Sequence, residues 1–296
     1  MELRVLQYFL TVAREQSISR AAEVLHMTQP PLSRQLMDLE KELGKPLFIR
    51  GSRRITLTEE GIILRKRAEE MLELMEKTRA EVTASENTVS GEIYIGSGET
   101  EGFRIIAEAA RRLHEQYPEV RYNLFSGNAD DVLERLDHGL LDLAVVISPT
   151  ESKQYEYVSL PAANTMGLLV RRDHPLSKRA YILPQDLTNI PLIVPRKLTD
   201  NNRFTNWLGG KSDRLSVVAV SNLLYNASLM VEEGVGCALC LGGIIPEHDR
   251  SLSCFRPLKD HAAADVAVIW KKDQVLTKPA VKLLEEIRKS RKSLIG

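Results

Sequence analysis

The sequence predicts a multi-domain α+β protein, and three stretches of the chain carry that prediction. Residues 17–60 fit two short helices separated by a tight turn, with a short hairpin after them. Residues 64–82 carry apolar positions at heptad spacing, which is typical of one long helix. From residue 93 onward, short apolar strands alternate with helices, which indicates a parallel sheet covered by helices. The length of 296 residues accommodates two or three domains.

The composition is that of an ordinary folded protein. Apolar residues make up 43% of the chain and charged residues 27%, which argues against disorder. No run approaches the ~18 apolar residues that a membrane-spanning helix needs. The N-terminus also lacks the basic-then-apolar pattern of a secretory signal. We therefore expect a cytoplasmic protein that does not enter a membrane.

Basic residues are concentrated near the N-terminus, although the formal net charge of the whole chain is zero. Residues 1–67 hold 12 Lys/Arg against 8 Asp/Glu, an excess of four positive charges. Residues 43–58 contain basic residues and no acidic one. Contact with phosphate depends on such a local patch, so the neutral total does not exclude nucleic acid.

The first two predicted helices form a closely crossing pair. In residues 2–15 the apolar positions recur at helical spacing: Leu3, Leu6, Phe9, Leu10 and Ala13. Ser19 is the predicted N-cap of the second helix. Ala21 and Ala22 in that helix are small enough to let the two helices approach closely.

The third predicted helix has one apolar face and one polar face. Thr28 is its predicted N-cap, and the two prolines after Gln29 fall in the first turn, where a missing N–H costs nothing. Leucines at 32, 36, 39 and 43 predict the buried face. On the other face, Arg34 suits guanine and Gln35 suits adenine in the major groove. For an isolated helix, such a polar face is more often simply solvated.

A basic hairpin follows this helix and favours the DNA interpretation. Two short apolar runs flank a Gly-Ser turn at 51–52, which predicts a β-hairpin, or wing. Arg50, Arg53 and Arg54 in this hairpin are placed to reach the DNA backbone or minor groove.

Residues 1–60 resemble the winged helix-turn-helix of LysR-type transcriptional regulators. The family pattern, S-x-x-x-A-A-x-x-L-H-x-S/T-Q-P-x-L-S-R-Q and then L-E-x-E-L-G-x-P-L-F-x-R, is matched almost throughout from Ser17 to Gln35 and from Leu39 to Arg50. The resemblance implies a DNA-binding domain over residues 1–58. The predicted DNA contacts are Ser19, Arg20, Thr28, Gln29, Pro30, Pro31, Ser33, Arg34, Gln35, Arg50, Arg53 and Arg54.

The heptad stripe predicts a linker helix over residues 59–88 that joins two copies of the chain. Its members are Leu64, Ala68, Met71, Met75, Thr78 and Val82, at spacings of 4, 3, 4, 3 and 4. Either the stripe packs on its own domain or it pairs with a second copy, and we favour the two-chain coiled coil. A dimer would present two recognition helices to two half-sites.

The remaining chain, residues 89–296, is predicted to fold as two α/β lobes. The first βαβαβ unit has strands at 93–95, 120–125 and 141–147 and helices at 103–116 and 130–137. Further strands are predicted at 166–170, 192–194, 217–220, 236–240 and 264–270, and helices at 201–208, 223–232 and 276–290. This part resembles, more weakly, the periplasmic-binding-protein-like effector domain of the same family. The resemblance implies lobe one at 89–160 and 263–296 and lobe two at 161–262.

The predicted effector site lies where the strands of the two lobes end. Ligands of open α/β sheets bind outside the carboxyl ends of strands, near helix N-termini. The residues at those ends are Gly98, Glu99, Thr100, Ser126, Gly127, Asn128, Ile147, Ser148, Pro195, Arg196, Ser221 and Asn222. Taken singly, Ser, Thr and Asn at such positions are more often helix caps than ligand contacts.

One loop departs from the family pattern. The first loop of these domains often carries small hydroxyl residues that bind an anion, whereas here it contains Glu99 and Glu101. These carboxylates either offset a helix dipole or favour a hydroxylated or cationic ligand. Arg196 in the other lobe favours an anion, so the charge of the effector stays open.

The three cysteines favour a reduced compartment over a disulfide framework. Cys237 and Cys240 form a lone C-x-x-C in an apolar, Gly-rich segment. A structural zinc needs two more ligands nearby, and no second pair is present in the sequence. We therefore expect buried strand cysteines, with a redox pair or a metal site as the less favoured alternatives.

Other classes of protein fit the sequence less well. It contains no H-E-x-x-H, G-x-S-x-G or Walker lysine motif, so we expect no enzyme, no cofactor and no metal. A binding protein that had lost DNA recognition would show degraded residues at Gln29, Arg34 and Gln35, and all three are present. A nonspecific nucleoid protein would carry more positive charge.

The family resemblance also implies partners. These are double-stranded DNA, a small-molecule effector, further copies of the chain in a dimer or homotetramer, and RNA polymerase. The family binds an interrupted palindrome, and effector binding moves the lobes and changes DNA bending. The sequence therefore predicts a ligand-responsive transcription factor.

Overall fold

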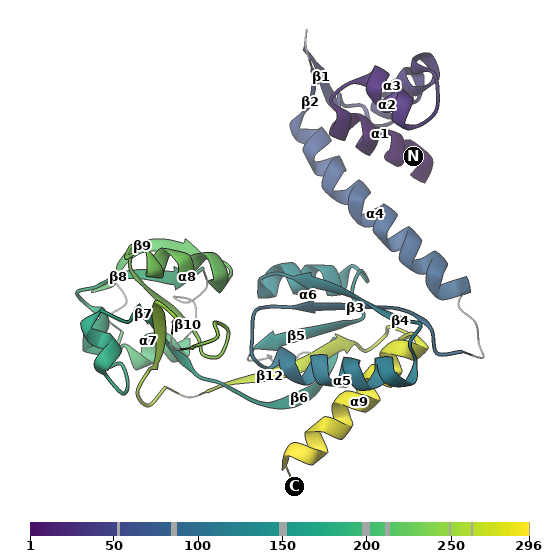
Figure 1. Cartoon of the computed structure of the whole chain (residues 1–296). Helices are drawn as coiled ribbons and strands as arrows, with labels where there is room; N and C mark the ends of the chain where they lie inside the picture. Colours follow the sequence, from purple (N-terminus) through teal and green to yellow (C-terminus); the bar gives the residue numbers. More distant parts are fainter. Residues whose placement is uncertain are drawn as a thin grey trace. The chain divides into compact units, whose positions relative to one another are not determined.

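A computed structural model describes residues 1–51, 54–83, 88–147, 153–196, 202–210, 214–248, 250–261 and 263–295. The chain divides into two compact units, Met1–Ala84 and Ser85–Gly296 (Figure 1). Each unit has its own hydrophobic core, so each is described by itself.

The first unit is a three-helix core with a two-stranded wing. Its elements are α1 Leu3–Glu15, α2 Ile18–Val24, α3 Gln29–Leu43, β1 Phe48–Arg50, β2 Ile55–Leu57 and α4 Glu59–Thr83. The predicted leucine face of α3 is confirmed for Leu32, Leu36 and Leu39, which are buried. Leu43 is exposed because it is the last residue of the helix, beside the left-handed Gly44 that ends it.

The buried face of α1 is shifted from the predicted stripe. The helix buries Val5, Leu6, Phe9 and Val12. Leu3 was expected in this core and is instead exposed, and it lies beside residues of α4. Periodicity identified the helix, but the neighbouring helices decided which of its apolar residues pack inward.

Helix α2 begins earlier than predicted. Ser17, and not Ser19, is its N-cap, and the Ser17 hydroxyl accepts a hydrogen bond from the Arg20 N–H at 3.4 Å. Ser19 lies inside the helix, and its hydroxyl donates to Oε1 of Gln29 at the start of α3, at 3.2 Å. His26 adopts a positive φ of 51°, which makes the tight turn between the two helices.

The wing is the predicted hairpin, and it leads directly into α4. Strands β1 and β2 pair antiparallel, with Phe48 opposite Leu57 and Arg50 opposite Ile55. Helix α4 starts so close to the wing that a Cβ on Gly61 would lie 2.2 Å from the carbonyl oxygen of Leu47. Glycine is therefore required at this close approach.

Only the first part of the α4 stripe is buried within its own unit. Ala68 is fully buried, and Leu64 packs against the core of the first unit. Met71 and Val82 are 41% and 79% exposed. The stripe thus packs on its own unit in the first half of the helix, and its second half is more exposed in the single chain.

The second unit contains two five-stranded sheets. The first has the order β4-β3-β5-β12-β6 and the second the order β11-β7-β10-β8-β9. The strands of the first sheet are β3 Gly91–Ser97, β4 Val120–Ser126, β5 Leu143–Ile147, β6 Tyr155–Asn164 and β12 Ala264–Lys271. Those of the second sheet are β7 Met166–Arg171, β8 Pro191–Pro195, β9 Ser216–Ser221, β10 Cys237–Leu241 and β11 Ser253–Pro257.

Three neighbouring strands on one side of each sheet are parallel, as the alternating pattern predicts, whereas β7 pairs antiparallel with β10 and β11. In the first sheet β3 pairs parallel with β4 and β5, and in the second β8 pairs parallel with β9 and β10. Strand β12 joins the first sheet antiparallel to β5 and β6. The C-terminal part of the chain thus completes the first lobe.

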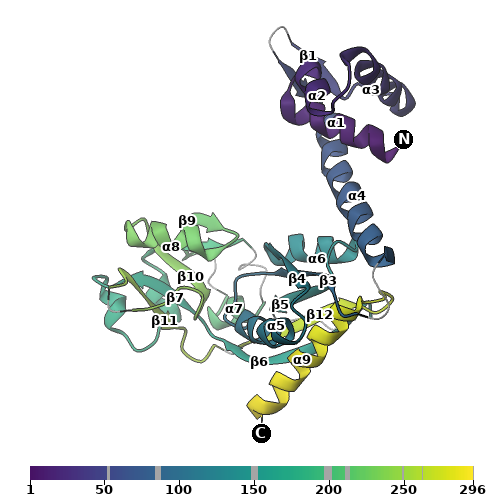
Figure 2. The ribbon, with the colours of Figure 1, turned by 45° about the vertical axis from the view of Figure 1, so that its right-hand side comes forward.

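Helices cover both faces of the sheets. They are α5 Phe103–Gln116, α6 Ala129–Asp137, α7 Asn202–Trp207, α8 Leu224–Glu232 and α9 Lys278–Ile295, with 3-10 turns at Pro175–Lys178 and Pro184–Leu187. In the first lobe α5 and α9 pack on one face of the sheet and α6 on the other, as Figure 2 shows from a second side. In the second lobe α8 packs on one face and α7 on the other.

Two strands were not predicted from the sequence, and one of them changes the predicted boundary between the lobes. Strands β6 and β11 lie in stretches with mixed polar and apolar residues and no clear period. The predicted limit at residue 160 falls inside β6, which pairs with β12 as far as Asn164 opposite Ala264. The two crossings between the lobes therefore start side by side.

Candidate functional site

The polar face of α3 is open to solvent on the first unit. Gln29, Pro30, Pro31 and Arg34 are exposed, whereas Ser33 and Gln35 are half-buried. The exposed residues lie opposite the buried Leu32 and its neighbours, so the helix can fill a groove of DNA without uncovering the core. Thr28 occupies the N-cap position, but its side chain makes no capping hydrogen bond and is exposed.

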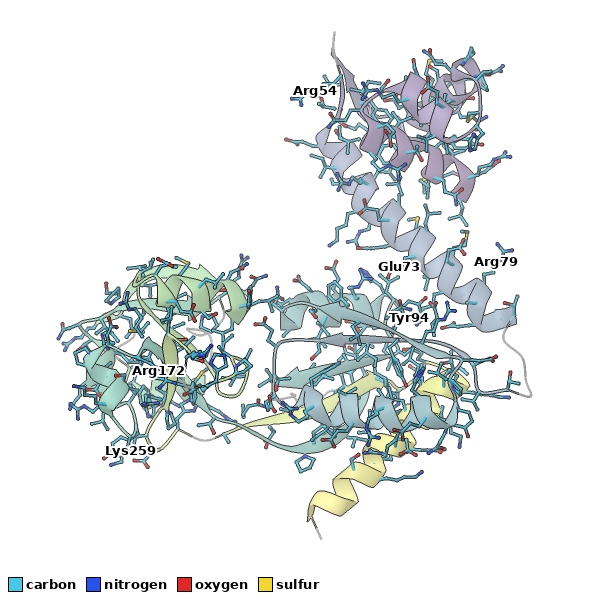
Figure 3. The ribbon with its side chains drawn as sticks, viewed as in Figure 1. Arg54, Glu73, Arg79, Tyr94, Arg172 and Lys259 are labelled. Atoms are coloured by element: carbon cyan, nitrogen blue, oxygen red, sulfur yellow. The ribbon has the colours of Figure 1, made fainter. Side chains whose placement is uncertain are left out.

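The predicted contacts beside this helix fall into two groups. Ser19, Arg20 and Arg54 are exposed, and Arg54 precedes β2 in the wing (Figure 3). Arg53 and the side chain of Arg50 lie outside the described residues. The hydrogen bond from Ser19 to Gln29 ties the first turn of α2 to the first residue of α3, and so it orients the exposed face.

A second surface on the first unit is apolar. An open groove, here called the α4 groove, is lined by Leu3, Met71, Leu74, Met75, Thr78, Arg79, Val82 and Thr83. Four of the six residues of the predicted stripe line it. Leu74 and Arg79 also line it and were not part of the stripe; Figure 3 labels Arg79 near the C-terminal end of α4.

The second unit holds a cavity of about 210 Å³ at the ends of strands from both lobes. The polar lining residues are Glu99, Asn128, Ser221 and Asn222. The other lining residues are Gly98, Gly127, Ala129, Ile147, Ile193, Val194, Pro195, Leu223, Leu224, Ala227, Ala238, Leu239, Cys240, Leu241 and Ile244. The wall is therefore mainly apolar, with a few polar groups, which is the usual character of a small-molecule site.

The cavity gathers most of the predicted effector residues. Gly98, Glu99, Gly127, Asn128, Ile147, Pro195, Ser221 and Asn222 line it. Thr100, Ser126 and Arg196 do not, and Ser148 lies outside the described residues. The Thr100 hydroxyl donates instead to Oδ1 of the buried Asn164 at 2.8 Å, and the exposed Arg196 donates its backbone N–H to the Ser221 carbonyl at 3.1 Å.

The apolar wall is the part that sequence reasoning missed. It comes from β8, β10 and α8, for example Ile193, Ala238 and Ala227. Alternate residues of a strand face opposite sides of a sheet, so these positions would have been found only once the cavity face of each strand was known.

Glu99 bridges the two lobes across this cavity. One oxygen of its carboxylate, Oε2, accepts a hydrogen bond from the Leu224 N–H, the first residue of α8. The N-cap of α8 is Leu223, which has no side chain able to cap the helix. A carboxylate from the first lobe thus serves as the missing cap and faces the positive end of the helix dipole.

Cys237 and Cys240 form neither a disulfide nor a metal pair. Three residues apart on one strand, they point to opposite faces of the sheet: Cys237 packs in one core cluster and Cys240 in another. Burial raises the pKa of the Cys237 thiol to about 11 and that of Cys240 to about 12. The expectation of buried strand cysteines is confirmed.

Two family models match the chain. The model described as "Bacterial regulatory helix-turn-helix protein, lysR family" matches residues 3–62, and "LysR substrate binding domain" matches residues 86–292. The second match begins next to the boundary between the two compact units, Ala84 and Ser85, and the first match lies within the first unit. In the part of the chain that the structure describes, no helix is long and apolar enough to cross a membrane.

Curated relatives and solved structures agree with these matches. The HTH-type transcriptional regulator BsdA of Bacillus subtilis (strain 168) is 31% identical over 294 residues, which cover 96% of this chain and 99% of BsdA. The hydrogen peroxide-inducible genes activator of Pectobacterium carotovorum subsp. carotovorum is 28% identical over 97% of this chain and 96% of its own length. Full-length CbnR, crystallised with its target DNA, shares the fold with a TM-score of 0.75 at 21% identity, over 98% of this chain and 100% of that chain. The chain therefore belongs to the LysR family of DNA-binding transcriptional regulators, with a winged helix-turn-helix, a long linker helix and a two-lobed, periplasmic-binding-protein-like effector domain.

Proposed function

We propose that this regulator binds an interrupted palindromic operator as a dimer or homotetramer, and that a small molecule in the inter-lobe cavity modulates it. Residues 1–58 bind the operator, residues 59–88 join two copies, and residues 89–296 bind the effector. RNA polymerase is a further partner in this proposal.

The exposed face of α3 carries the operator-binding part of the proposal. Gln29, Pro30, Pro31 and Arg34 project from one side of a helix whose other side is locked into the core by leucines. A rigid helix with an exposed arginine matches the way in which major-groove readers recognise guanine. The basic wing supplies phosphate contacts beside it.

The α4 groove supports a dimer, and a dimer explains an operator with two half-sites. Residues of the groove such as Met71 and Val82 stay exposed in the single chain, and the same residues carry the heptad spacing. Two copies that cover this groove would place two α3 helices on one DNA duplex.

Replacing Arg34 with alanine tests the base-reading role. Random-sequence selection with the wild-type chain first yields a preferred site, and fluorescence anisotropy then measures affinity for that site and for its single-base variants. Arg34→Ala should cut discrimination at one position of each half-site by about 1–3 kcal/mol. Discrimination stays intact at the other positions.

Arg14→Ala is the matched control, because it removes the same charge from α1, where Arg14 is 67% exposed and pairs with Glu15 at 3.0 Å. It should weaken binding to all sequences to a similar, small extent. If Arg34→Ala left discrimination unchanged, or behaved like Arg14→Ala, the assignment of α3 as the base-reading helix would be wrong.

A further inference from the structure

The chemical class of the effector can be read from the polar groups of the inter-lobe cavity, and this step rests on the proposed effector site. Among the described lining residues, Glu99 is the one that bears a charge, and neither lysine nor arginine lines the cavity. Arg196, which favoured an anionic ligand on sequence grounds, is exposed and outside the lining.

The helix ends that could have held an anion are already occupied. The N-termini of α6 and α8 both border the cavity. The Leu224 N–H of α8 donates to the Glu99 carboxylate, and the N-terminus of α6 is capped by the Asn128 side chain. A carboxylate of the ligand would therefore meet another carboxylate instead of a free helix end.

Two of the three neutral polar side chains in the lining, those of Asn128 and Ser221, are engaged within the protein. Asn128 caps α6 through Oδ1, and its Nδ2 donates to Asp131 at 2.7 Å. The Ser221 hydroxyl donates to the Leu223 carbonyl oxygen. Asn222 is therefore the neutral polar lining side chain left for a ligand, and its amide offers an anion only uncharged donors.

An acceptor, by contrast, remains open. Only Oε2 of Glu99 is engaged by Leu224, and among the described residues no donor contacts Oε1. A charged acceptor in a mainly apolar cavity favours a ligand that brings its own proton donor, and a cationic donor makes the strongest such hydrogen bond.

We propose that the cavity binds an apolar molecule bearing an amine, whose ammonium group pairs with the free oxygen of Glu99. The hydrocarbon part of the ligand packs on the wall formed by Ile193, Ala238 and Leu239. The ammonium group lies beside a carboxylate that already joins the two lobes, so ligand binding acts directly on the bridge from Glu99 to α8.

Matched probes test this proposal on the full chain. Isothermal titration calorimetry at pH 7 measures the dissociation constants of benzylamine and benzoate, which share one ring and differ in charge, and of hexylamine and hexanoate as an aliphatic pair. The wild-type chain should bind each amine at least about tenfold more tightly than its acid, the size expected of one charge-assisted hydrogen bond.

Glu99→Gln removes the charge and keeps the helix cap, because the glutamine side-chain oxygen can still accept from Leu224. It should abolish the amine preference. Glu101→Gln is the matched control: Glu101 is a neighbouring carboxylate that pairs with Arg104 at 2.5 Å and does not line the cavity. This variant should keep the preference. Preference for the acids, or an amine preference that survives Glu99→Gln, would overturn the proposed ligand class.

A third variant separates failure of the ligand class from failure of the site. Ala129→Trp introduces a large side chain at an exposed position of the cavity lining. It should weaken both members of each pair about tenfold or more by filling space. If the probes bind the wild-type chain and Ala129→Trp has no effect on their affinity, they bind elsewhere, and the proposed effector site is wrong. The proposed site is also wrong if no probe binds the wild-type chain at 10 mM.

Discussion

At the scale of single residues, position in the backbone controls what a side chain can do. The C-x-x-C spacing suits a redox pair on a helix or loop. On strand β10, the same spacing places the side chains of Cys237 and Cys240 on opposite faces of the sheet. Burial then raises the pKa of both thiols, so the nucleophilic thiolate is rare at neutral pH. The same motif is thus structural here.

We expect the native thiols to react slowly. Iodoacetamide at pH 8 should label Cys237 and Cys240 at a small fraction of the rate seen in guanidinium chloride, as measured by mass spectrometry. Fast labelling of either native thiol would contradict the buried assignment. Ellman's reagent on the native chain provides an independent readout.

The raised thiol pKa values also predict a loss of stability at high pH. The protonated thiols add stability that is fully present below the unfolded-state pKa, about 8.5, and is lost as pH rises towards 11 and 12. The free energy of unfolding should fall by about 2 kcal/mol per thiol by pH 10. Urea unfolding measures the free energy of unfolding of the wild type and of a Cys237→Ala/Cys240→Ala variant across this pH range. The difference in free energy of unfolding between the two proteins should shrink as pH rises only if the thiols titrate as described.

At the scale of elements, α4 changes its role along its length. Its first part is held by Gly61 against the wing and by Ala68 in the core, which makes it part of the first unit. Its second part presents Met71, Leu74 and Val82 in the α4 groove. In the proposed dimer, α4 can thus transmit the position of the partner copy to the recognition helix, because its two halves form one continuous helix.

Met71→Lys should break the proposed dimer by placing a charge in the α4 groove, where Met71 is 41% exposed in the single chain. Burying an unpaired ammonium group costs several kcal/mol, so we expect the association constant to fall by a factor of about 100 or more. Sedimentation velocity over a concentration series measures the change.

Ala80→Lys adds the same charge on the opposite side of α4, at an exposed residue outside the groove. This variant should sediment as the wild type does. An unchanged oligomer in Met71→Lys, or equal effects of the two lysines, would show that the α4 groove is not the contact between copies.

At the scale of the whole molecule, the chain forms two compact units, each with its own hydrophobic core. The core of the first unit draws on residues between Val5 and Leu64, and the cores of the second on residues between Val89 and Ile287. No core cluster among the described residues combines the two units. We therefore expect the proposed operator reading and the proposed ligand binding to be changed separately by mutation.

A fragment of residues 88–296 should fold alone. Because its core clusters are complete, we expect a cooperative thermal transition within about 3 °C of one transition of the full chain, by differential scanning calorimetry. A fragment that lacked a cooperative transition would mean that residues of the first unit are needed to complete the second.

The sequence predicts the positions of helices and strands better than it predicts which of their faces are buried. The helix at 103–116 was predicted with its observed bounds, and the parallel strands of both lobes were found with end errors of one or two residues. Strand β6 was missed because its mixed polar and apolar residues give no period. Eight of the twelve predicted effector residues line the cavity, since strand ends in parallel sheets meet at one edge.

The sequence by itself determined the family, the helix-turn-helix, the polar face of α3 and the strand ends that surround the cavity. These features depend on the spacing of residues that are close together in the chain. Only the tertiary structure decided that Glu99 caps α8 of the other lobe and that Arg196 is exposed outside the cavity lining. It also decided which half of the α4 stripe is buried. These outcomes depend on groups far apart in the chain, such as Glu99 and Leu224, and no local pattern records which of them meet.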